Sequence, residues 1–360
     1  FAHVLAGHLS VHFGCDGAYE LLIDGETWLH GGGTTVRRGG LELSSNSSLV
    51  VVSCVRSDGD DATFGPFEET VVSWGVQGEN GVLLETIART FPRRNAVAFE
   101  QRFPVALEQT SSEDRVCDYA QSWIGCDWRG VVAGFPTWQL DKPDLAWMMF
   151  YGEHLNDAHN PTGRGPRFGR WSADDPPPQG LLAGPLSVFD STRALVLGAL
   201  TNSMAGSVAL NGMELQFGPM GGVESIPADW SYSILVQAES GINRAWEAWG
   251  NFLLERHGKT NKVSDFTNSH LGYQTNNGAY YYYKPMEGKD FRFTLDRVQQ
   301  GLGEKVPVRW ANLDSWRYFK SHGTTGGEGV PLGGGCENWT TMPSVFDGGD
   351  AGVAAMHRDT

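Results

Sequence analysis

The spacing of apolar residues changes character once along this chain, near residue 240, and that change limits the possible folds more than any other feature. Before it, short β-branched and aliphatic runs alternate with turn signals such as Asn211-Gly212. Residues 97–103 (VAFEQRF) alternate apolar and polar side chains, which is typical of a strand with one buried face. Many such strands without helical periodicity predict a large β-sandwich domain over residues 1–240.

Residues 241–257 (GINRAWEAWGNFLLERH) carry the first strong helical pattern. Four apolar side chains of this segment fall on one helical face: Ile242, Trp246, Trp249 and Leu253. Gly258 follows as a signal for the end of a helix, and a polar stretch continues to residue 269. We therefore expect residues 241–269 to form a linking helix and a linker.

The remaining chain has a different order of elements. Residues 271–284 predict an aromatic strand, residues 293–305 a helix, residues 306–313 a second strand, and residues 350–358 the start of a second helix. Strand, helix, strand, helix is the order of a parallel sheet. Two such units cannot close a barrel, which needs eight. Either residues 270–360 pack on the sandwich, or they begin a barrel that continues in a longer protein. We expect the second, so that residues 270–360 are the first two units of a (β/α)8 barrel in a truncated chain and the fold class is multidomain β and α/β.

Charge and motifs exclude several classes of function. The formal net charge of −15, from 42 acidic and 27 basic residues, disfavours a nucleic-acid or anionic-membrane surface. No apolar run approaches the ~18 residues of a membrane span. The histidines show no close ligand spacing, and the glycine-rich segments lack the phosphate-loop pattern. We expect no metal, no other cofactor, no nucleic acid and no membrane span.

The five cysteines are an odd number and contain no CxxC pair. Cys117 and Cys126 flank a short tryptophan-containing stretch, and we expect a local disulfide between them. The pairing of the other three stays open: Cys15, Cys54 and Cys336.

Two sequons, at Asn46 and Asn338, are candidate glycosylation sites. The chain also begins at Phe1 without a methionine, so either a targeting segment has been removed or the chain is a piece of something longer. Together these features favour a secreted, extracellular or luminal location.

The best candidate site follows the second predicted strand, at Asp314 and Trp316. Polar residues at the carboxyl end of a barrel strand face the mouth of the active site. A carboxylate can accept hydrogen bonds from two sugar hydroxyls, and an indole can stack on the apolar face of a pyranose ring. The alternative is an aspartate that caps the next segment beside a core tryptophan, and the sequence leaves both open.

Three further residues are candidates for the same mouth. Tyr273 and Asn276 belong to the first predicted strand, although the tyrosine run at residues 280–283 could instead fill a core. Trp339 follows the glycine-rich loop and is also part of the Asn338 sequon. A glycosylated asparagine must face solvent, so sugar binding and glycosylation compete as interpretations of that segment.

The sequence Leu313-Asp314-Ser315-Trp316 at the end of the second strand, after a large sandwich and a linking helix, resembles the retaining α-glycosidases of the α-galactosidase and raffinose synthase type. Their second barrel strand typically ends in Asp-Asp-Gly-Trp, and those acids bind sugar hydroxyls. Asp314 matches the second Asp, Ser315 the Gly and Trp316 the Trp. Leu313 stands where the first Asp belongs, and it cannot accept that hydrogen bond.

The sandwich is similar to the N-terminal domain of that family in three short segments. These are residues 64–67 (FGPF) leading to Trp74, residues 90–93 (TFPR), and residues 99–104 (FEQRFP). The resemblance in architecture spans most of the chain, whereas the specific motifs that carry it cover a few dozen residues.

The resemblance also implies what this chain lacks. Such enzymes use an aspartate nucleophile on the fourth barrel strand and an aspartate acid/base on the sixth, with carboxyl groups ~5–5.5 Å apart. Neither position falls on a residue here, so the catalytic residues are unknown and we expect the 360 residues alone to be inactive.

The function we expect is therefore that of a glycoside hydrolase-like protein that acts on or binds α-linked, galactoside-like carbohydrate. Its partners would be carbohydrate and other subunits or the rest of its own barrel. The alternative is a non-catalytic extracellular glycoprotein or assembly subunit on a glycosidase-like scaffold.

Overall fold

The computed structural model divides into two compact units, Phe1–Lys259 and Thr260–Thr360. Within them it describes residues 8–112, 115–116, 127–128, 130–151, 165–179, 185–259, 265–275, 285–313, 317–320, 325–326, 330–331 and 336–359. In the first unit strands dominate; the second combines short strands with three helices in its described part.

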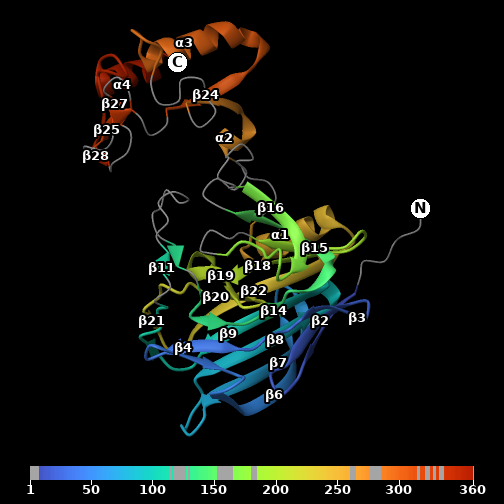
Figure 1. The fold of residues 1–360 in the computed structure, drawn as a ribbon. Helices are drawn as coiled ribbons and strands as arrows, with labels where there is room; N and C mark the ends of the chain where they lie inside the picture. Colours follow the sequence, from blue (N-terminus) through green and yellow to red (C-terminus); the bar gives the residue numbers. More distant parts are fainter. Residues whose placement is uncertain are drawn as a thin grey trace, which may run out of the picture. The chain divides into compact units, whose positions relative to one another are not determined.

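The first unit is built on a nine-stranded antiparallel sheet in the order β16-β15-β17-β18-β22-β9-β8-β7-β6 (Figure 1). Its strands are β6 (Leu49–Asp61), β7 (Gly65–Val76), β8 (Leu84–Phe91), β9 (Ala96–Phe103), β15 (Asp141–Tyr151), β16 (Gly165–Ser172), β17 (Leu186–Phe189), β18 (Ala194–Thr201) and β22 (Trp230–Glu239). Strands that follow one another in sequence pair antiparallel in most of the sheet: β6 to β9 in a row, β15 with β16, and β17 with β18.

Three smaller antiparallel sheets and two short strand pairs complete this unit. The first sheet contains β1 (Leu9–Phe13), β2 (Tyr19–Ile23) and β3 (Glu26–His30); the second contains β13 (Ala133–Gly134), β4 (Thr35–Arg38) and β5 (Leu41–Ser44); the third contains β14 (Thr137–Gln139), β20 (Glu214–Pro219) and β19 (Gly206–Asn211). The pairs are β10 (Leu107–Glu108) with β21 (Ser225–Ile226), and β11 (Arg115–Val116) with β12 (Asp127–Trp128).

The core lies between the large sheet and the smaller ones. Tyr19 of β2, Phe99 of β9 and Trp138 of β14 are buried, and their ring centroids lie 5.3–5.9 Å apart. All three belong to one hydrophobic cluster. Its residues come from the nine-stranded sheet and from the three smaller sheets. The mostly-β character predicted for residues 1–240 is confirmed, and a shared core between sheets is what the predicted sandwich requires.

Helix α1 (Ile242–Arg256) covers the opposite face of the large sheet. Ala96 and Ala98 of β9 pack with Phe252 of α1, whereas Val97 and Phe99 of the same strand face the main core. Further along β9 the outward positions are charged instead of apolar, at Glu100 and Arg102. The alternation seen in the sequence of this strand therefore separates two buried layers at one end and a charged surface at the other.

One disulfide joins Cys15, in the turn after β1, to Cys54 in β6, with the two Cα atoms 5.4 Å apart. The sequence left this pairing open, since an odd number of cysteines gives no unique partner. The predicted Cys117–Cys126 bridge lies outside the described residues.

In the second unit, β23 (Leu271–Gln274) and β24 (Val308–Asn312) form a parallel pair, and α3 (Phe291–Leu302) lies between them in sequence. A short 3-10 turn, η3 (Gly303–Lys305), ends the segment that the sequence predicted as helix to residue 305. The predicted first strand ran to residue 284, whereas β23 ends at Gln274 and residues 276–284 lie outside the described part. The continuation of this pair into a barrel stays a prediction.

Strands that the sequence did not reveal lie within the glycine-rich loop predicted at about residues 321–335 and on either side of it. Antiparallel β25 (Tyr318–Lys320) and β28 (Cys336–Thr341) pair with each other, as do β26 (Thr325–Gly326) and β27 (Val330–Pro331). Helix α2 (Phe266–Ser269) precedes β23, and α4 (Gly349–Asp359) follows β28. No helix among the described residues is both long enough and apolar enough to cross a membrane.

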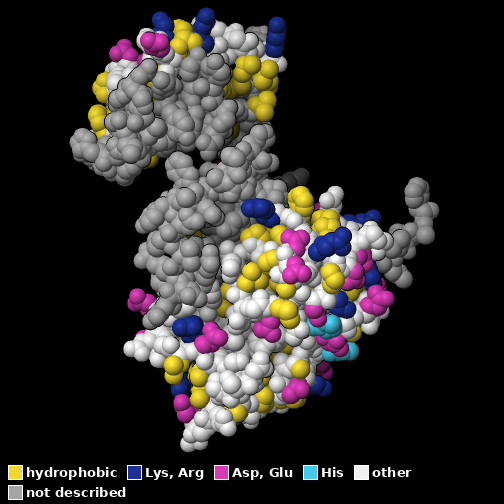
Figure 2. All heavy atoms as spheres, in the orientation of Figure 1, with side chains coloured by type: hydrophobic (Ala, Val, Ile, Leu, Met, Phe, Trp, Pro, Cys, Tyr) yellow, Lys and Arg dark blue, Asp and Glu magenta, His cyan; other side chains and the backbone are white. Residues whose placement is uncertain are grey.

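Acidic and basic side chains are interspersed on the face of the first unit drawn in Figure 2. This mixture matches the acidic overall charge of the sequence, and no broad basic surface forms on that face in the part that the structure describes.

Candidate functional site

The candidate site in the second unit begins where β23 and β24 end. Gln274 lies opposite Asn312 in the parallel register, and the Thr275 amide donates a hydrogen bond of 3.1 Å to the Asn312 carbonyl. The carboxyl ends of the two strands are therefore level. Residues that follow these ends start from the same edge, which is where sites collect in parallel α/β folds.

Of the predicted sugar contacts on these two strands, the structure describes Tyr273 alone. Its side chain is half-buried, and desolvation raises the pKa of its hydroxyl, so that it is protonated and able to donate at neutral pH. Asn276, Asp314 and Trp316 lie outside the described residues, and their roles stay predictions.

Leu313 is described, and it packs against the hydrophobic cluster of Phe291, Met342, Val345 and Phe346. This is the position at which the resembled family has its first aspartate. A leucine side chain in that place contributes to the core of the second unit and offers no acceptor to a sugar hydroxyl.

Trp339, the remaining predicted contact, is 66% exposed on β28. Its ring stacks on Tyr318 of β25 at a centroid distance of 4.7 Å and an interplanar angle of 29°. The Arg317 guanidinium lies over the Trp339 ring, 5.4 Å from its centroid. Exposed aromatic rings of this kind provide the flat apolar face on which a pyranose can stack.

Hydrogen bonds hold Arg317 in position. Its Nη1 donates to Thr341 Oγ1 at 3.1 Å, and its carbonyl accepts from the Met342 amide at 2.7 Å. The Thr341 amide in turn donates to Asp350 Oδ1 at 2.7 Å. Hydrogen bonds from Thr341 first, and the Arg317 charge in addition, lower the pKa of Asp350 and keep it ionised.

We call the residues Arg317, Tyr318, Trp339, Thr341 and Asp350 the Trp339 cluster. The sequence indicated Trp339, and Arg317 and Tyr318 as the end of the candidate segment 312–318, but it did not indicate Thr341 or Asp350. Arg317 and Tyr318 directly follow the Asp-Ser-Trp segment, which was the available signal. Asp350 lies in the first turn of α4, and nothing in the sequence pattern connects it with Thr341.

The structure does not join Tyr273 to the Trp339 cluster: within the described part of the second unit, no hydrogen bond or ring contact links them. Tyr273 and Trp339, the two predicted sugar contacts that the structure describes, are therefore separate features of the second unit.

Both sequons have exposed asparagines. Asn338 precedes Trp339 on β28, and successive side chains of a strand point to opposite faces, so a glycan and a stacked sugar need not exclude each other. Asn46 is exposed in the turn between β5 and β6, where its backbone N–H donates a hydrogen bond of 3.1 Å to Ser44 Oγ. Glycosylation at both sites stays a prediction.

The described residues contain no group of three or more histidine, cysteine, aspartate or glutamate side chains that could hold a metal ion. What the described residues of the site offer is hydrogen bonding, aromatic stacking and the Arg317 guanidinium.

No protein-family model matches the sequence, and no curated protein matches it. Solved structures do. An α-N-acetylgalactosaminidase from Bifidobacterium bifidum, in complex with Gal-NHAc-DNJ, matches 98% of this chain at 12% identity and a TM-score of 0.50. α-Galactosidases from Lactobacillus brevis (11% identity, TM-score 0.43, 95% of this chain) and from Geobacillus stearothermophilus with raffinose (10%, 0.44, 98%) also match.

This chain spans 56% of the length of the Bifidobacterium bifidum protein, and 44% and 46% of the two α-galactosidases. At such identities the similarity concerns the fold alone. The chain has a mostly-β first unit and a short mixed second unit, and it aligns over nearly its whole length with a glycoside hydrolase. This protein therefore has a glycosidase-like fold.

Proposed function

We propose that this chain is the N-terminal part of a retaining α-glycosidase of the α-galactosidase and α-N-acetylgalactosaminidase type, and that its second unit supplies part of the sugar-binding subsite. The observation that carries the proposal is the level end of β23 and β24. In the sequence, β24 is followed by Asp314 and Trp316, the pair predicted as sugar contacts.

In this proposal Asp314 accepts hydrogen bonds from two hydroxyls of the terminal sugar, and Trp316 packs against its apolar face. The fold supports the assignment, since the solved structure that aligns with the chain at a TM-score of 0.50 is an α-N-acetylgalactosaminidase. The chemical step would belong to carboxylates outside these 360 residues, because a retaining mechanism needs a nucleophile and an acid/base that no residue here matches.

Binding of galactose and of N-acetylgalactosamine to the 360-residue chain tests the proposal, by isothermal titration calorimetry. Asp314→Asn should weaken binding by roughly 2–4 kcal/mol, because it leaves the sugar hydroxyls without a charged acceptor. Asp296→Asn is the matched control, since Asp296 is an exposed acid on α3. Equal affinity of the Asp314→Asn variant and wild type would remove Asp314 from the subsite.

One observation favours a second candidate, a non-catalytic glycoprotein or assembly subunit on the same scaffold. Leu313 fills the place of an acid in the resembled family and packs into the core of the second unit. A protein that binds neither sugar and whose longest natural form hydrolyses no α-galactoside would have this second function instead.

A further inference from the structure

The two sides of the β23–β24 pair can be told apart by what packs on them. Leu313, directly after β24, packs with Phe291 of α3 and with Val353 and Met356 of α4. Successive side chains of an extended chain point to opposite faces, so the side chain of Asn312 points away from this helical layer. The pair therefore has a helical side, marked by Leu313, and an opposite side, marked by Asn312.

Trp310 and Gly272 identify the other members of the opposite side. A Cβ atom at Gly272 would overlap the Trp310 ring, so the indole lies across β23 at that glycine. Its Nε1 donates a hydrogen bond of 3.0 Å to the His270 carbonyl, which fixes the ring in this place. Because side chains return to the same face at every second residue, Gln274 shares the face of Gly272, and Asn312 shares that of Trp310.

Gln274 and Asn312 bring two carboxamides together at the carboxyl ends of the strands. They are partners in the parallel register, and neighbouring strands lie about 4.8 Å apart. Both side chains are exposed, and neither makes a hydrogen bond in the part of the chain that the structure describes. Tyr273, whose register partner is Ala311, belongs to the helical side instead.

The carboxamides complement the carboxylate that follows them in the sequence. Asp314 is two residues after Asn312, which is the spacing of side chains on one face of a strand. An ionised carboxylate only accepts hydrogen bonds, whereas each sugar hydroxyl both donates one and accepts others. A site made of Asp314 alone would leave the hydroxyl oxygens without donors. The NH2 groups of Gln274 and Asn312 are donors at the same edge of the sheet.

We propose, on the basis of the function proposed above, that Gln274 and Asn312 are sugar-binding residues whose carboxamides donate hydrogen bonds to hydroxyl oxygens of the terminal sugar beside Asp314. The Trp310 indole lies one pleat below them and forms the floor of this subsite. Gly272 is the residue that leaves room for the indole.

The test uses the longest natural polypeptide that contains this sequence. The measured quantity is kcat/KM for p-nitrophenyl α-galactoside and for a set of its analogues that each lack one hydroxyl of the galactose. Gln274→Met and Asn312→Leu remove one carboxamide each and keep the size of the side chain. Gln299→Met is the matched control, since Gln299 is an exposed glutamine on α3.

Each of the two amide variants should lower kcat/KM for the complete galactoside about tenfold, the effect of one lost hydrogen bond. The loss should disappear for the analogue that lacks the hydroxyl bound by the missing amide, because neither protein can then make that contact. A side chain that only supports the fold would instead lower kcat/KM equally for every analogue. Gln299→Met should match wild type throughout.

Gln274→Glu and Asn312→Asp remove only the NH2 donor and keep the polarity of the side chain. They replace the apolar variants if those do not fold, and the same dependence on a single hydroxyl is expected of them.

Wild-type kcat/KM in the amide variants, or an equal loss with every analogue, would overturn the assignment of Gln274 and Asn312. The proposed function would survive that result if wild type turns over the galactoside and Asp314→Asn loses activity. A wild type that neither binds nor hydrolyses the sugar would remove the proposed function, and this inference with it.

Discussion

Arg193 shows how single residues hold the turns of the first unit together. Its Nη2 bonds to Asp190 Oδ2 at 2.9 Å and to Glu26 Oε2 at 3.1 Å, and its guanidinium lies over the Trp28 ring. The turn between β17 and β18 is thereby tied to the β2–β3 hairpin. Burial of Asp190 opposes its ionisation, but hydrogen bonds from Thr192 and Arg193 outweigh burial and lower its pKa.

This arrangement predicts a pH-dependent loss of stability. Because the folded pKa of Asp190 lies below its unfolded value, its contribution is present above the unfolded pKa and is lost as the pH falls through the folded one. Arg193→Met should lower the free energy of unfolding by ~1 kcal/mol at neutral pH, and by less in strong acid. Urea unfolding of this variant and of Arg244→Met, which loses a hydrogen bond to Ser240, makes the comparison; an equal loss at every pH would contradict the account.

Trp339 carries a second prediction at this scale. Trp339→Ala should weaken galactoside binding by about tenfold, since it removes the exposed stacking face of the Trp339 cluster. Because the ring is largely exposed, the free energy of unfolding should change by only about 1 kcal/mol. Phe168→Ala, which truncates an exposed aromatic residue of the first unit, is the control for both measurements; wild-type affinity of the Trp339 variant would exclude this cluster from the site.

Among the elements, β6 depends most on a covalent link. It is an edge strand of thirteen residues, and most of its side chains are exposed, including four valines. Little buried apolar surface therefore holds it to the sheet. The Cys15–Cys54 disulfide connects it to the turn after β1, across 39 positions of sequence.

Removal of this disulfide should destabilise the first unit. A loop of this length predicts a loss of about 3–4 kcal/mol in the free energy of unfolding for the double change Cys15→Ser and Cys54→Ser. Guanidinium unfolding with and without reductant measures it. The reductant should lower wild-type stability but not that of the double variant, and a reductant-insensitive wild type would contradict the assigned bridge.

The elements also show how far the sequence could predict the fold. Period-two alternation in residues 97–103 and the apolar face of residues 242–253 identified β9 and α1, because burial against a sheet enforces those periods. The β25–β28 pair could not be found in this way. Its strands pair antiparallel across about twenty residues of sequence, with Tyr318 stacked on Trp339, and the glycine-rich sequence between them is typical of a loop.

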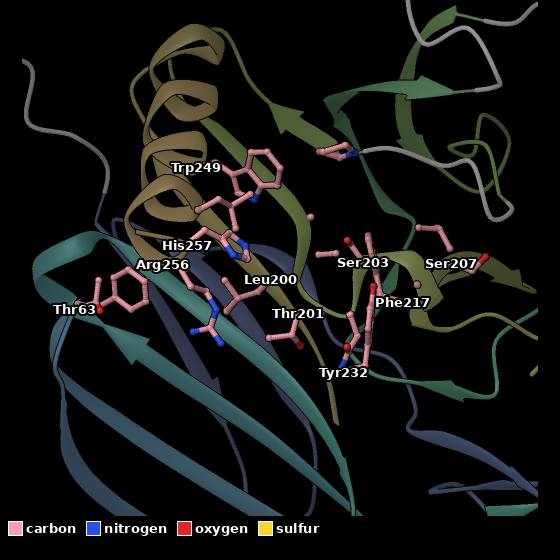
Figure 3. Close-up of a pocket in the computed structure, with 18 of the residues that line it drawn as sticks. Thr63, Leu200, Thr201, Ser203, Ser207, Phe217, Tyr232, Trp249, Arg256 and His257 are labelled. Atoms are coloured by element: carbon pink, nitrogen blue, oxygen red, sulfur yellow. The ribbon is translucent and has the colours of Figure 1, made fainter. Parts of the chain in front are cut away.

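At the scale of the whole molecule, composition and element order predicted the class of fold but not its sites. The pocket between α1, the ends of β18 and β22 and the β19–β20 hairpin (Figure 3) draws on residues from Asp61 to His257, so no local motif could indicate it. The cysteine pairing was undetermined for the same reason, because five residues far apart in sequence allow many partners. The edge of β23 and β24 was predictable, since the βαβ order itself places two carboxyl ends together.

As proposed above, this chain is the N-terminal part of a retaining α-glycosidase. The most direct measurement is hydrolysis of p-nitrophenyl α-galactoside and α-N-acetylgalactosaminide by the longest natural polypeptide that contains this sequence, with the first-formed anomer followed by NMR. The account predicts turnover, an α-anomer as first product, and a loss of about 2–4 kcal/mol in transition-state binding for Asp314→Asn. No hydrolysis of either substrate by a polypeptide that binds neither sugar would contradict it.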